Sequence, residues 1–123
     1  MLNGKTVVLG VTGGIACYKA AALCSKLTQA GADVRVIMTE SAAKFVAPLT
    51  FQTLSRHDVF IDTFDEKDAS VVSHIDLADR ADLFVVAPAT ANIIAKMAHG
   101  LADDMLSTTL LATQAPVLLA PAM

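Results

Sequence analysis

Four short apolar segments, separated by stretches with helical periodicity, most constrain how this chain can fold. They span residues 5–11, 33–38, 81–88 and 115–121. Each is mostly apolar over a strand's length, as expected of strands buried in a sheet. Between the first two, apolar residues recur at helical spacing over 15–30, and Gly31 is placed to end that helix. Strands that alternate with helices in this way form βαβ units, so the sequence predicts one α/β domain with a parallel sheet and helices on both faces.

The remaining stretches predict shorter elements. A short helix should follow residues 39–41 and end before Pro48, because the residue before a proline avoids helical conformations. Residues 50–68 are less regular, and we expect one helical turn, a short strand near 59–61 and an acidic exposed loop. The last two helices are predicted at 92–99 and 101–113.

The chain is apolar for its length of 123 residues. Hydrophobic residues make up 54% of it and charged residues 17%, whereas charged residues are about a quarter of a typical soluble domain. A sheet buried on both faces, surfaces covered by partner subunits, or both would account for this. Cys17 and Cys24 lie seven residues apart on one predicted helix, too far for a disulfide, and are expected to be buried thiols.

Charge and hydropathy exclude two classes of partner. The net charge is −3, and the Lys and Arg residues are scattered, so no nucleic-acid partner is expected. No apolar run reaches the 18 or so residues of a membrane helix, and the N-terminus lacks the layout of a signal peptide. We therefore expect a cytoplasmic protein with no membrane partner.

The polar and glycine-containing motifs all follow predicted strands. They occupy residues 12–14, 39–41, 88–92 and 121–123. In open parallel sheets, ligands bind outside the carboxyl ends of the strands. The shared position of these motifs therefore predicts a ligand site along that edge of the sheet.

Each motif alone has a structural alternative. Gly13 and Gly14 would let backbone N–H groups at a helix start approach a phosphate, or would simply form a turn; the pattern is neither GxGxxG nor a Walker A loop. Ser41 is either a helix cap or a phosphate contact. Thr90 and Asn92 offer hydrogen bonds at the same edge, and either could instead cap the next helix.

Of the three histidines, one stands out by its position. His57 and His99 lie in polar surroundings, and His99 precedes Gly100 at a predicted helix end, where a cation is stabilising. His74 precedes the amphipathic stretch that leads into the third strand. It is a candidate general base, with a structural histidine as the alternative.

Together these motifs resemble a known family. The segments VTGGIACYKA, VIMTESAAKFV, SHIDLADRAD, VVAPATAN and APAM occur in the order and spacing of the homo-oligomeric flavin-containing cysteine decarboxylases, and are most similar to the branch that includes the N-terminal domains of bacterial bifunctional enzymes. The resemblance covers the whole chain. It implies a three-layer flavodoxin-like or Rossmann-like parallel sheet, with FMN as cofactor.

The resemblance also implies roles for individual residues. His74 matches the catalytic histidine and is placed close to the flavin-binding edge. The residues that match flavin contacts are Gly13, Gly14, Ile15, Thr39, Ser41, Thr90, Ala91, Asn92 and Ala122. Among these, Thr39 and Ser41 match the segment that helps to hold the phosphate. No metal is implied.

The implied reaction is the FMN-dependent decarboxylation of 4′-phospho-N-pantothenoylcysteine to 4′-phosphopantetheine, a step of coenzyme A biosynthesis. Oxidation of the substrate's cysteine side chain places its carboxylate β to an electron sink, so carbon dioxide can leave; the later reduction makes the cycle redox-neutral. Family members assemble into trimers and dodecamers, so self-association is expected, which agrees with the apolar composition.

The chain departs from the family pattern in two respects. Ile93 stands where the flavin loop often has Thr, so one polar contact is missing or is supplied by the backbone. An asparagine that contacts the substrate carboxylate and a cysteine on a flexible flap lie beyond Met123 in the family, and neither Cys17 nor Cys24 matches that cysteine. We therefore expect residues 1–123 to form a C-terminally truncated flavoprotein domain that keeps most of the FMN surface but does not complete decarboxylation.

Other interpretations remain open from the sequence. Flavin prenyltransferases and one of the dipicolinate synthase polypeptides share the implied fold, although the His74 motif favours a decarboxylase. A non-catalytic regulatory relative is a second alternative, but the long acidic extensions of such proteins are not present in this sequence. A nicotinamide-dependent enzyme is a third, and the lack of GxGxxG and of a ribose-binding acid other than Glu40 argues against it.

Overall fold

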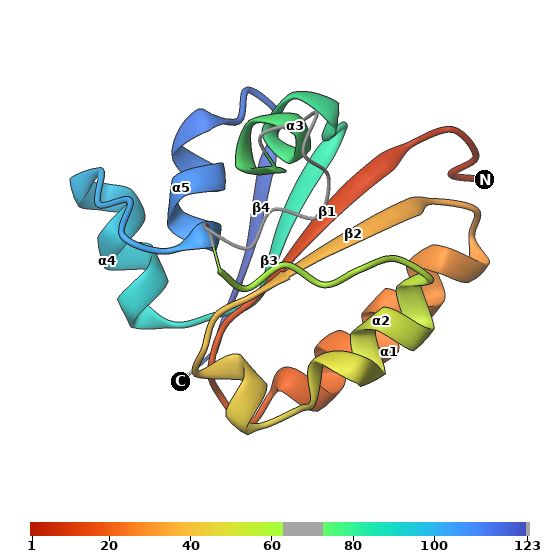
Figure 1. Ribbon diagram of the computed structural model, residues 1–123, viewed down its shortest axis with the longest axis horizontal. Coiled ribbons are helices and arrows are strands. Elements are labelled where there is room, and N and C mark those ends of the chain that lie inside the picture. Colours follow the sequence, from red (N-terminus) through yellow and green to blue (C-terminus); the bar gives the residue numbers. More distant parts are fainter. Residues whose placement is uncertain (63–72, 123) are drawn as a thin grey trace.

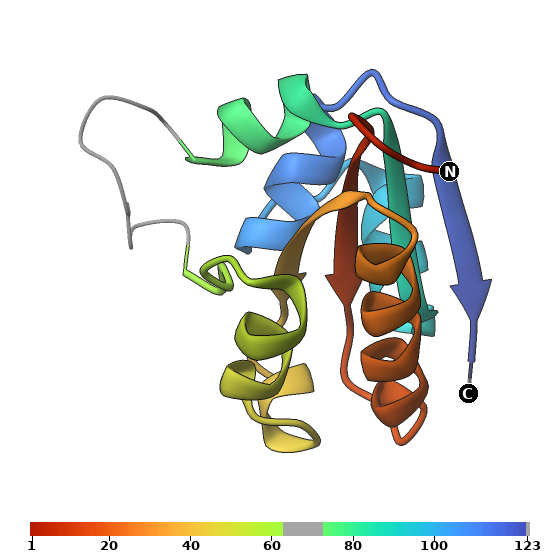
Figure 2. The same ribbon diagram turned by 90° about the vertical axis from the view of Figure 1, so that its right-hand side faces the viewer.

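A computed structural model of the chain describes residues 1–62 and 73–122, and helices separate its successive strands, as predicted. In chain order the elements are β1 (Thr6–Val11), α1 (Cys17–Gln29), β2 (Asp33–Met38), the 3₁₀ helix η1 (Ala42–Lys44), α2 (Pro48–Ser55), α3 (Ser73–Arg80), β3 (Leu83–Ala89), α4 (Ala91–His99), α5 (Met105–Ala112) and β4 (Val117–Pro121). The four strands are parallel, in the order β2-β1-β3-β4. Helices α1 and α2 cover one face of the sheet, and α3, α4 and α5 lie on the other (Figures 1 and 2).

The core is divided by the sheet into two clusters. Val7, Leu9 and Val11 of β1 point into the cluster shared with α1 and α2, whereas Val8 points into the cluster on the opposite face. Strand residues alternate between faces, so a strand with apolar residues on both sides must be covered on both. The predicted three-layer α/β architecture is therefore confirmed.

Three predicted elements differ from the structure. Helix α2 begins at Pro48 and has two turns instead of one, because proline suits the first position of a helix, where its missing N–H is not needed. The strand expected near 59–61 is a single bridge between Ile37 and Phe60. The last helix begins at Met105, four residues later than predicted, because Asp104 caps it. Most of the acidic loop predicted before residue 68 lies outside the described residues.

Strand β4 is less covered than the continuous apolar sequence predicts. The exposed fraction is 57% for Leu118 and 38% for Val117. The strand pairs with β3 on one side and forms the edge of the described sheet on the other. Burial of the sheet thus explains only part of the apolar composition, since apolar side chains also reach the surface.

The predictions about the two cysteines are confirmed. Cys17 and Cys24 are both buried free thiols, and burial raises the pKa of Cys24 to about 11. None of the helices in the part of the chain that the structure describes is long and apolar enough to cross a membrane.

Candidate functional site

Two adjoining pockets lie at the carboxyl ends of the strands, where the sheet order reverses between β1 and β3. In the sheet, β2 lies on one side of β1 and β3 lies on the other. Where the strand order reverses in this way, a parallel sheet has a crevice in which ligands bind. One pocket has a volume of about 460 Å³ and is called the polar pocket. The other has a volume of about 340 Å³ and is called the apolar pocket. Gly13, Thr90 and Asn92 line both.

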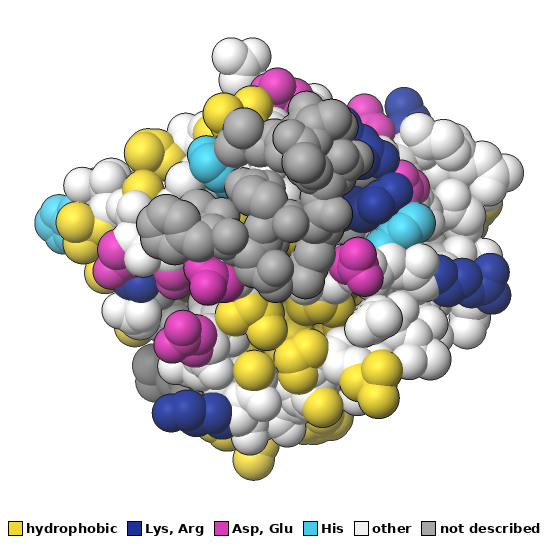
Figure 3. All heavy atoms as spheres, in the orientation of Figure 1, with side chains coloured by type: hydrophobic (Ala, Val, Ile, Leu, Met, Phe, Trp, Pro, Cys, Tyr) yellow, Lys and Arg dark blue, Asp and Glu magenta, His cyan; other side chains and the backbone are white. Residues whose placement is uncertain are grey.

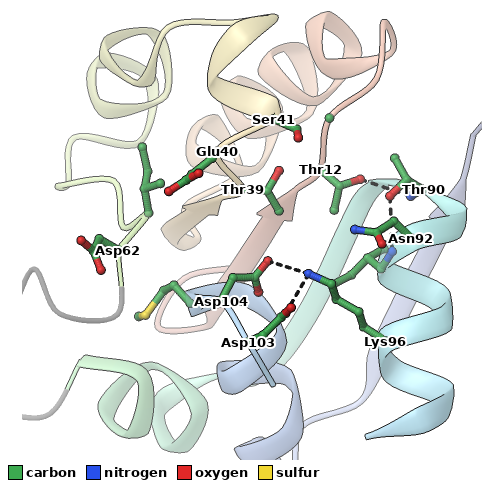
Figure 4. Close-up of a pocket in the computed structure, with 14 residues that line it drawn as sticks. Thr12, Thr39, Glu40, Ser41, Asp62, Thr90, Asn92, Lys96, Asp103 and Asp104 are labelled. Atoms are coloured by element: carbon green, nitrogen blue, oxygen red, sulfur yellow. Dashed lines mark hydrogen bonds and ion pairs between the residues drawn. The ribbon is translucent and has the colours of Figure 1, made fainter. Parts of the chain in front are cut away.

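Residues from several separate segments of the chain line the polar pocket (Figure 4). Its wall includes hydroxyl groups after β1 and β2, the start of α4, the segment before residue 63, and the turn that begins α5. The lining residues are Thr12, Gly13, Thr39, Glu40, Ser41, Ile61, Asp62, Thr90, Asn92, Ile93, Lys96, Asp103, Asp104 and Met105. The apolar pocket is formed by Gly13, Gly14, Ile15, Ala16, Pro88, Thr90, Ala91, Asn92 and Ala122.

All nine residues predicted to contact a cofactor line one of these two pockets. Thr39 and Ser41 line the polar pocket, and the other members lie in the apolar pocket or in both. The segments come from distant parts of the sequence and are joined by the parallel strands. The structure therefore brings the nine residues together around two pockets at this edge, and their binding of a ligand stays a prediction.

The two glycines of the first turn differ in their surroundings. A Cβ added at Gly13 would overlap the Cβ of Ser41, whereas a Cβ added at Gly14 would meet no atom within 4 Å. Neither glycine has a positive φ. Gly13 is thus needed for the close approach of the two loops, while Gly14 leaves open space beside the apolar pocket.

Helix α1 begins at this turn without a cap. Ala16 occupies the N-cap position, makes no side-chain hydrogen bond to the helix, and the first turn contains no acidic residue. In this first turn the Cys17 N–H donates to the Gly14 carbonyl at 3.0 Å and the Lys19 N–H donates to the Ala16 carbonyl at 2.9 Å, so what remains for a ligand is the partial positive charge of the helix start. An anion can therefore be stabilised at the start of α1.

The alternatives left open for the polar residues are now decided in part. Ser41 occupies the N-cap position of η1, but its side chain makes no capping bond; instead Thr39 Oγ1 accepts the Ala42 N–H at 3.1 Å. Thr90, not Asn92, caps α4, by accepting the Ile93 N–H at 3.4 Å. The Ser41 hydroxyl and the Asn92 amide therefore lie at the pocket wall and do not cap a helix.

A charged group that the sequence analysis did not identify forms the far wall of the polar pocket. Lys96 Nζ lies 2.8 Å from Asp103 Oδ1 and 3.3 Å from Asp104 Oδ2 (Figure 4). The hydrogen bond to Asp103 is the main cause that raises the pKa of Lys96, and the same bond lowers the pKa of Asp103. Asp104 also accepts the Ser107 N–H at 2.7 Å as the cap of α5. The spacing Asp-x-x-Ser was a usable capping signal in the sequence.

Ile93, the departure from the family's loop, is a core residue. Its side chain is 2% exposed and belongs to the cluster that includes Leu106 and Met105. Its backbone N–H is already bound to Thr90. The side chain at position 93 therefore stabilises the packing of α4 on the sheet.

His74 is not brought together with the pockets. It is the second residue of α3 and lines neither pocket, and α3 lies toward the end of the sheet where the strands begin (Figure 2). His74 therefore does not line either pocket of its own chain, and its expected closeness to the flavin-binding edge stays a prediction. The imidazole has one unusual property: its Nδ1 atom is buried without a hydrogen-bond partner among the described residues.

Polar contacts fix the helix that carries His74. Arg80, the last residue of α3, donates from Nη2 to Asp33 Oδ2 at 3.3 Å, and the Thr113 hydroxyl donates to the Ala78 carbonyl at 3.0 Å. Burial by itself raises the pKa of Asp33, but the hydrogen bond from Arg35 and the neighbouring positive charges hold it below its usual value. Helix α3 is therefore attached both to β2 and to the segment before β4.

Comparisons with known proteins agree with this geometry. The family model described as Flavoprotein matches residues 1–123. The coenzyme A biosynthesis bifunctional protein CoaBC of Bacillus subtilis (strain 168) is 69% identical over 123 residues, which span the whole of this chain but 30% of that relative. The FMN-dependent cysteine decarboxylase SpaF has a TM-score of 0.91 at 33% identity, over 100% of this chain and 71% of its own.

A further solved structure is a mutant PPC decarboxylase complexed with pantothenoylaminoethenethiol. It has a TM-score of 0.81 at 32% identity, over 97% of this chain and 67% of its own. Because the family model spans every residue, and relatives above 30% identity match nearly the whole chain, the chain belongs to the Flavoprotein family.

Proposed function

We propose that this chain is the FMN-binding part of a phosphopantothenoylcysteine (PPC) decarboxylase, which converts 4′-phospho-N-pantothenoylcysteine to 4′-phosphopantetheine in coenzyme A biosynthesis. The identity of 69% to a coenzyme A biosynthesis protein and the likeness to an FMN-dependent cysteine decarboxylase and a PPC decarboxylase support this. The single observation that carries it is the position of all nine expected cofactor residues around two adjoining pockets. A cytoplasmic location follows from the proposed biosynthetic role.

The residues present fit FMN. The positive end of the α1 dipole and the hydroxyl of Ser41 would stabilise the phosphate of FMN. The open space at Gly14 and the small side chains of Ala91 and Ala122 leave room for a flat ring in the apolar pocket. Both pockets have volumes in the range usual for small-molecule sites, about 300–1,000 Å³. Thr39, Ser41, Thr90 and Asn92 would supply polar contacts.

FMN, when bound, supplies the oxidation of the substrate's cysteine side chain and its later reversal. The chain's own contribution is to hold the cofactor and to move protons. His74 would act as a base, or as an orienting group, at the oxidation or decarboxylation step. The buried Nδ1 atom, which has no hydrogen-bond partner within residues 1–62 and 73–122, supports such a role, because an unsatisfied buried polar atom in a folded protein calls for an explanation.

Self-association, as a homotrimer or dodecamer, is part of the proposal. Exposed fractions of 76% for Ile15, 66% for Leu49 and 64% for Leu111 show that large apolar side chains reach the surface, and Figure 3 shows several such places on one face. Burying them against other copies of the chain would be favourable. It would also allow His74 of one copy to approach the pockets of another.

We also propose that residues 1–123 are the flavin-binding part of a larger domain. The asparagine that contacts the substrate carboxylate and the flap cysteine would then belong to the rest of that domain. The chain spans only 71% and 67% of the two solved structures, which is consistent with this. Turnover is therefore to be tested on a chimera in which this chain is continued by the sequence that comes after the matched region in the Bacillus subtilis relative.

The chimera, incubated with FMN and 4′-phospho-N-pantothenoylcysteine, is expected to release carbon dioxide and 4′-phosphopantetheine in equal amounts, measured by mass spectrometry. The 123-residue chain alone serves as the control and is expected to bind FMN without turnover. A chimera that binds FMN but leaves this substrate unchanged, while acting on another, would contradict the proposed reaction.

A further inference from the structure

Thr12 joins the two strands at the point where the pockets open. It comes directly after β1, is 2% exposed, and lines the polar pocket. Its hydroxyl donates to the Pro88 carbonyl and accepts the Thr90 N–H at 3.2 Å. One side chain thus binds two backbone groups, one in the last residues of β3 and one at the N-cap of α4.

These two hydrogen bonds connect the chain after β1 to the end of β3, beyond the last backbone pair between the two strands. The paired residues of β1 and β3 end at Gly10 and Val86, and the register between β3 and β4 shifts between Val86 and Ala89. Pro88 also has no N–H to contribute to a ladder. Ala89 still pairs with Pro121 of β4, so it is on the β1 side, where backbone pairing has ended, that the Thr12 hydroxyl holds this segment.

The contacts of Thr12 extend to the helices that border the pockets. Thr90, whose N–H it fixes, caps α4, and Ala91 and Asn92 come next at the wall of the apolar pocket. The Thr12 carbonyl in turn accepts a hydrogen bond from Cys17 Sγ in the first turn of α1, at 2.9 Å. The starts of both α1 and α4 are therefore linked to this residue.

We propose that Thr12 is a positioning residue for the cofactor: its hydroxyl holds residues 88–92, where β3 ends and α4 begins, in the geometry that binds FMN. This inference rests on the proposed function. A hydroxyl is required because a single oxygen atom must both donate and accept, which valine, with nearly the same shape, cannot do. Serine retains both bonds and should preserve the effect.

The test compares Thr12→Val with Thr12→Ser in the 123-residue chain, titrated with FMN and followed by flavin fluorescence and visible circular dichroism. Thr12→Val is expected to raise the dissociation constant of FMN by about tenfold and to change the visible dichroism of the bound flavin, as expected for loss of a buried hydrogen bond to each of two groups. Thr12→Ser is expected to stay within about threefold of the wild type.

Thr109→Val is the matched control for a purely structural effect. Thr109 is fully buried, donates to the Met105 carbonyl at 2.7 Å within α5, and lines neither pocket. Its replacement should lower the unfolding midpoint without changing the dissociation constant of FMN. If Thr12→Val does not fold, Thr12→Ala removes the hydroxyl without placing a second methyl group beside Pro88.

The outcomes separate this inference from the proposed function. The role of Thr12 is overturned, and the proposed function is kept, if the wild type binds FMN and Thr12→Val has the same dissociation constant. The same holds if Thr109→Val changes the dissociation constant as much as Thr12→Val does. Failure of the wild type to bind FMN overturns the proposed function and the role of Thr12 with it. A selective loss in Thr12→Val, restored in Thr12→Ser, supports both.

Discussion

Replacing His74 by asparagine is expected to lower kcat of the chimera by about 10²- to 10⁴-fold, the usual contribution of a general acid or base. The affinity for FMN should stay within about threefold, because His74 lines neither pocket of its own chain. Nδ1 has no hydrogen-bond partner among the described residues, so asparagine breaks no bond to this atom in that part of the molecule. The measurement is product formation under saturating substrate, with FMN content determined on the same sample.

His99→Asn is the control for this substitution. His99 is exposed in the last turn of α4, where its role is limited to the helix end. Its replacement should leave kcat unchanged. A His74→Asn chimera that keeps its FMN and turns over at the wild-type rate would remove His74 from the catalytic proposal.

The substitutions Gly13→Ala and Gly14→Ala are expected to separate folding from cofactor binding. At Gly13 the new methyl group would overlap Ser41 Cβ and lie 3.2 Å from the Ala42 nitrogen, so we expect the free energy of unfolding to fall by about 1–3 kcal/mol, as for other overpacked sites. At Gly14 the methyl group meets no atom within 4 Å. Stability should therefore be unchanged or should rise by about 0.5 kcal/mol.

FMN binding should respond in a different way. Gly14→Ala places a methyl group beside the apolar pocket, and we expect the dissociation constant of FMN to rise by about tenfold, equivalent to about 1.4 kcal/mol. Chemical denaturation without cofactor and FMN titration of the same variants provide the two measurements. A Gly14→Ala chain that binds FMN as tightly as the wild type, or a Gly13→Ala chain with an unchanged free energy of unfolding, would contradict these expectations.

The strands and the position of the ligand site could be predicted because both depend on local patterns. Buried parallel strands are short apolar runs, and the motif after each strand must lie at the same edge of the sheet. The start of α2 was missed because Pro48 was interpreted only as the end of the preceding helix, whereas proline also suits the first turn of a new one.

Other features of the site depend on contacts between distant residues. The hydroxyl of Thr12 binds the carbonyl of a residue 76 positions later, and the contact of Lys96 with Asp103 requires the turn between α4 and α5 to fold back. Periodicity and spacing contain no signal for either contact. The motif identifies His74 but gives no distance, and His74 does not line either pocket of its own chain.

The visible absorption spectrum of the purified 123-residue chain, recorded with added FMN after removal of free cofactor, tests the central claim most directly. The claim is that the edge of the sheet between β1 and β3 is an FMN site. We predict flavin bands that remain with the protein, at one FMN for each chain, and release of FMN, identified by its mass, on denaturation. A chain that stays colourless at saturating FMN, and a chimera that behaves in the same way, would contradict the claim.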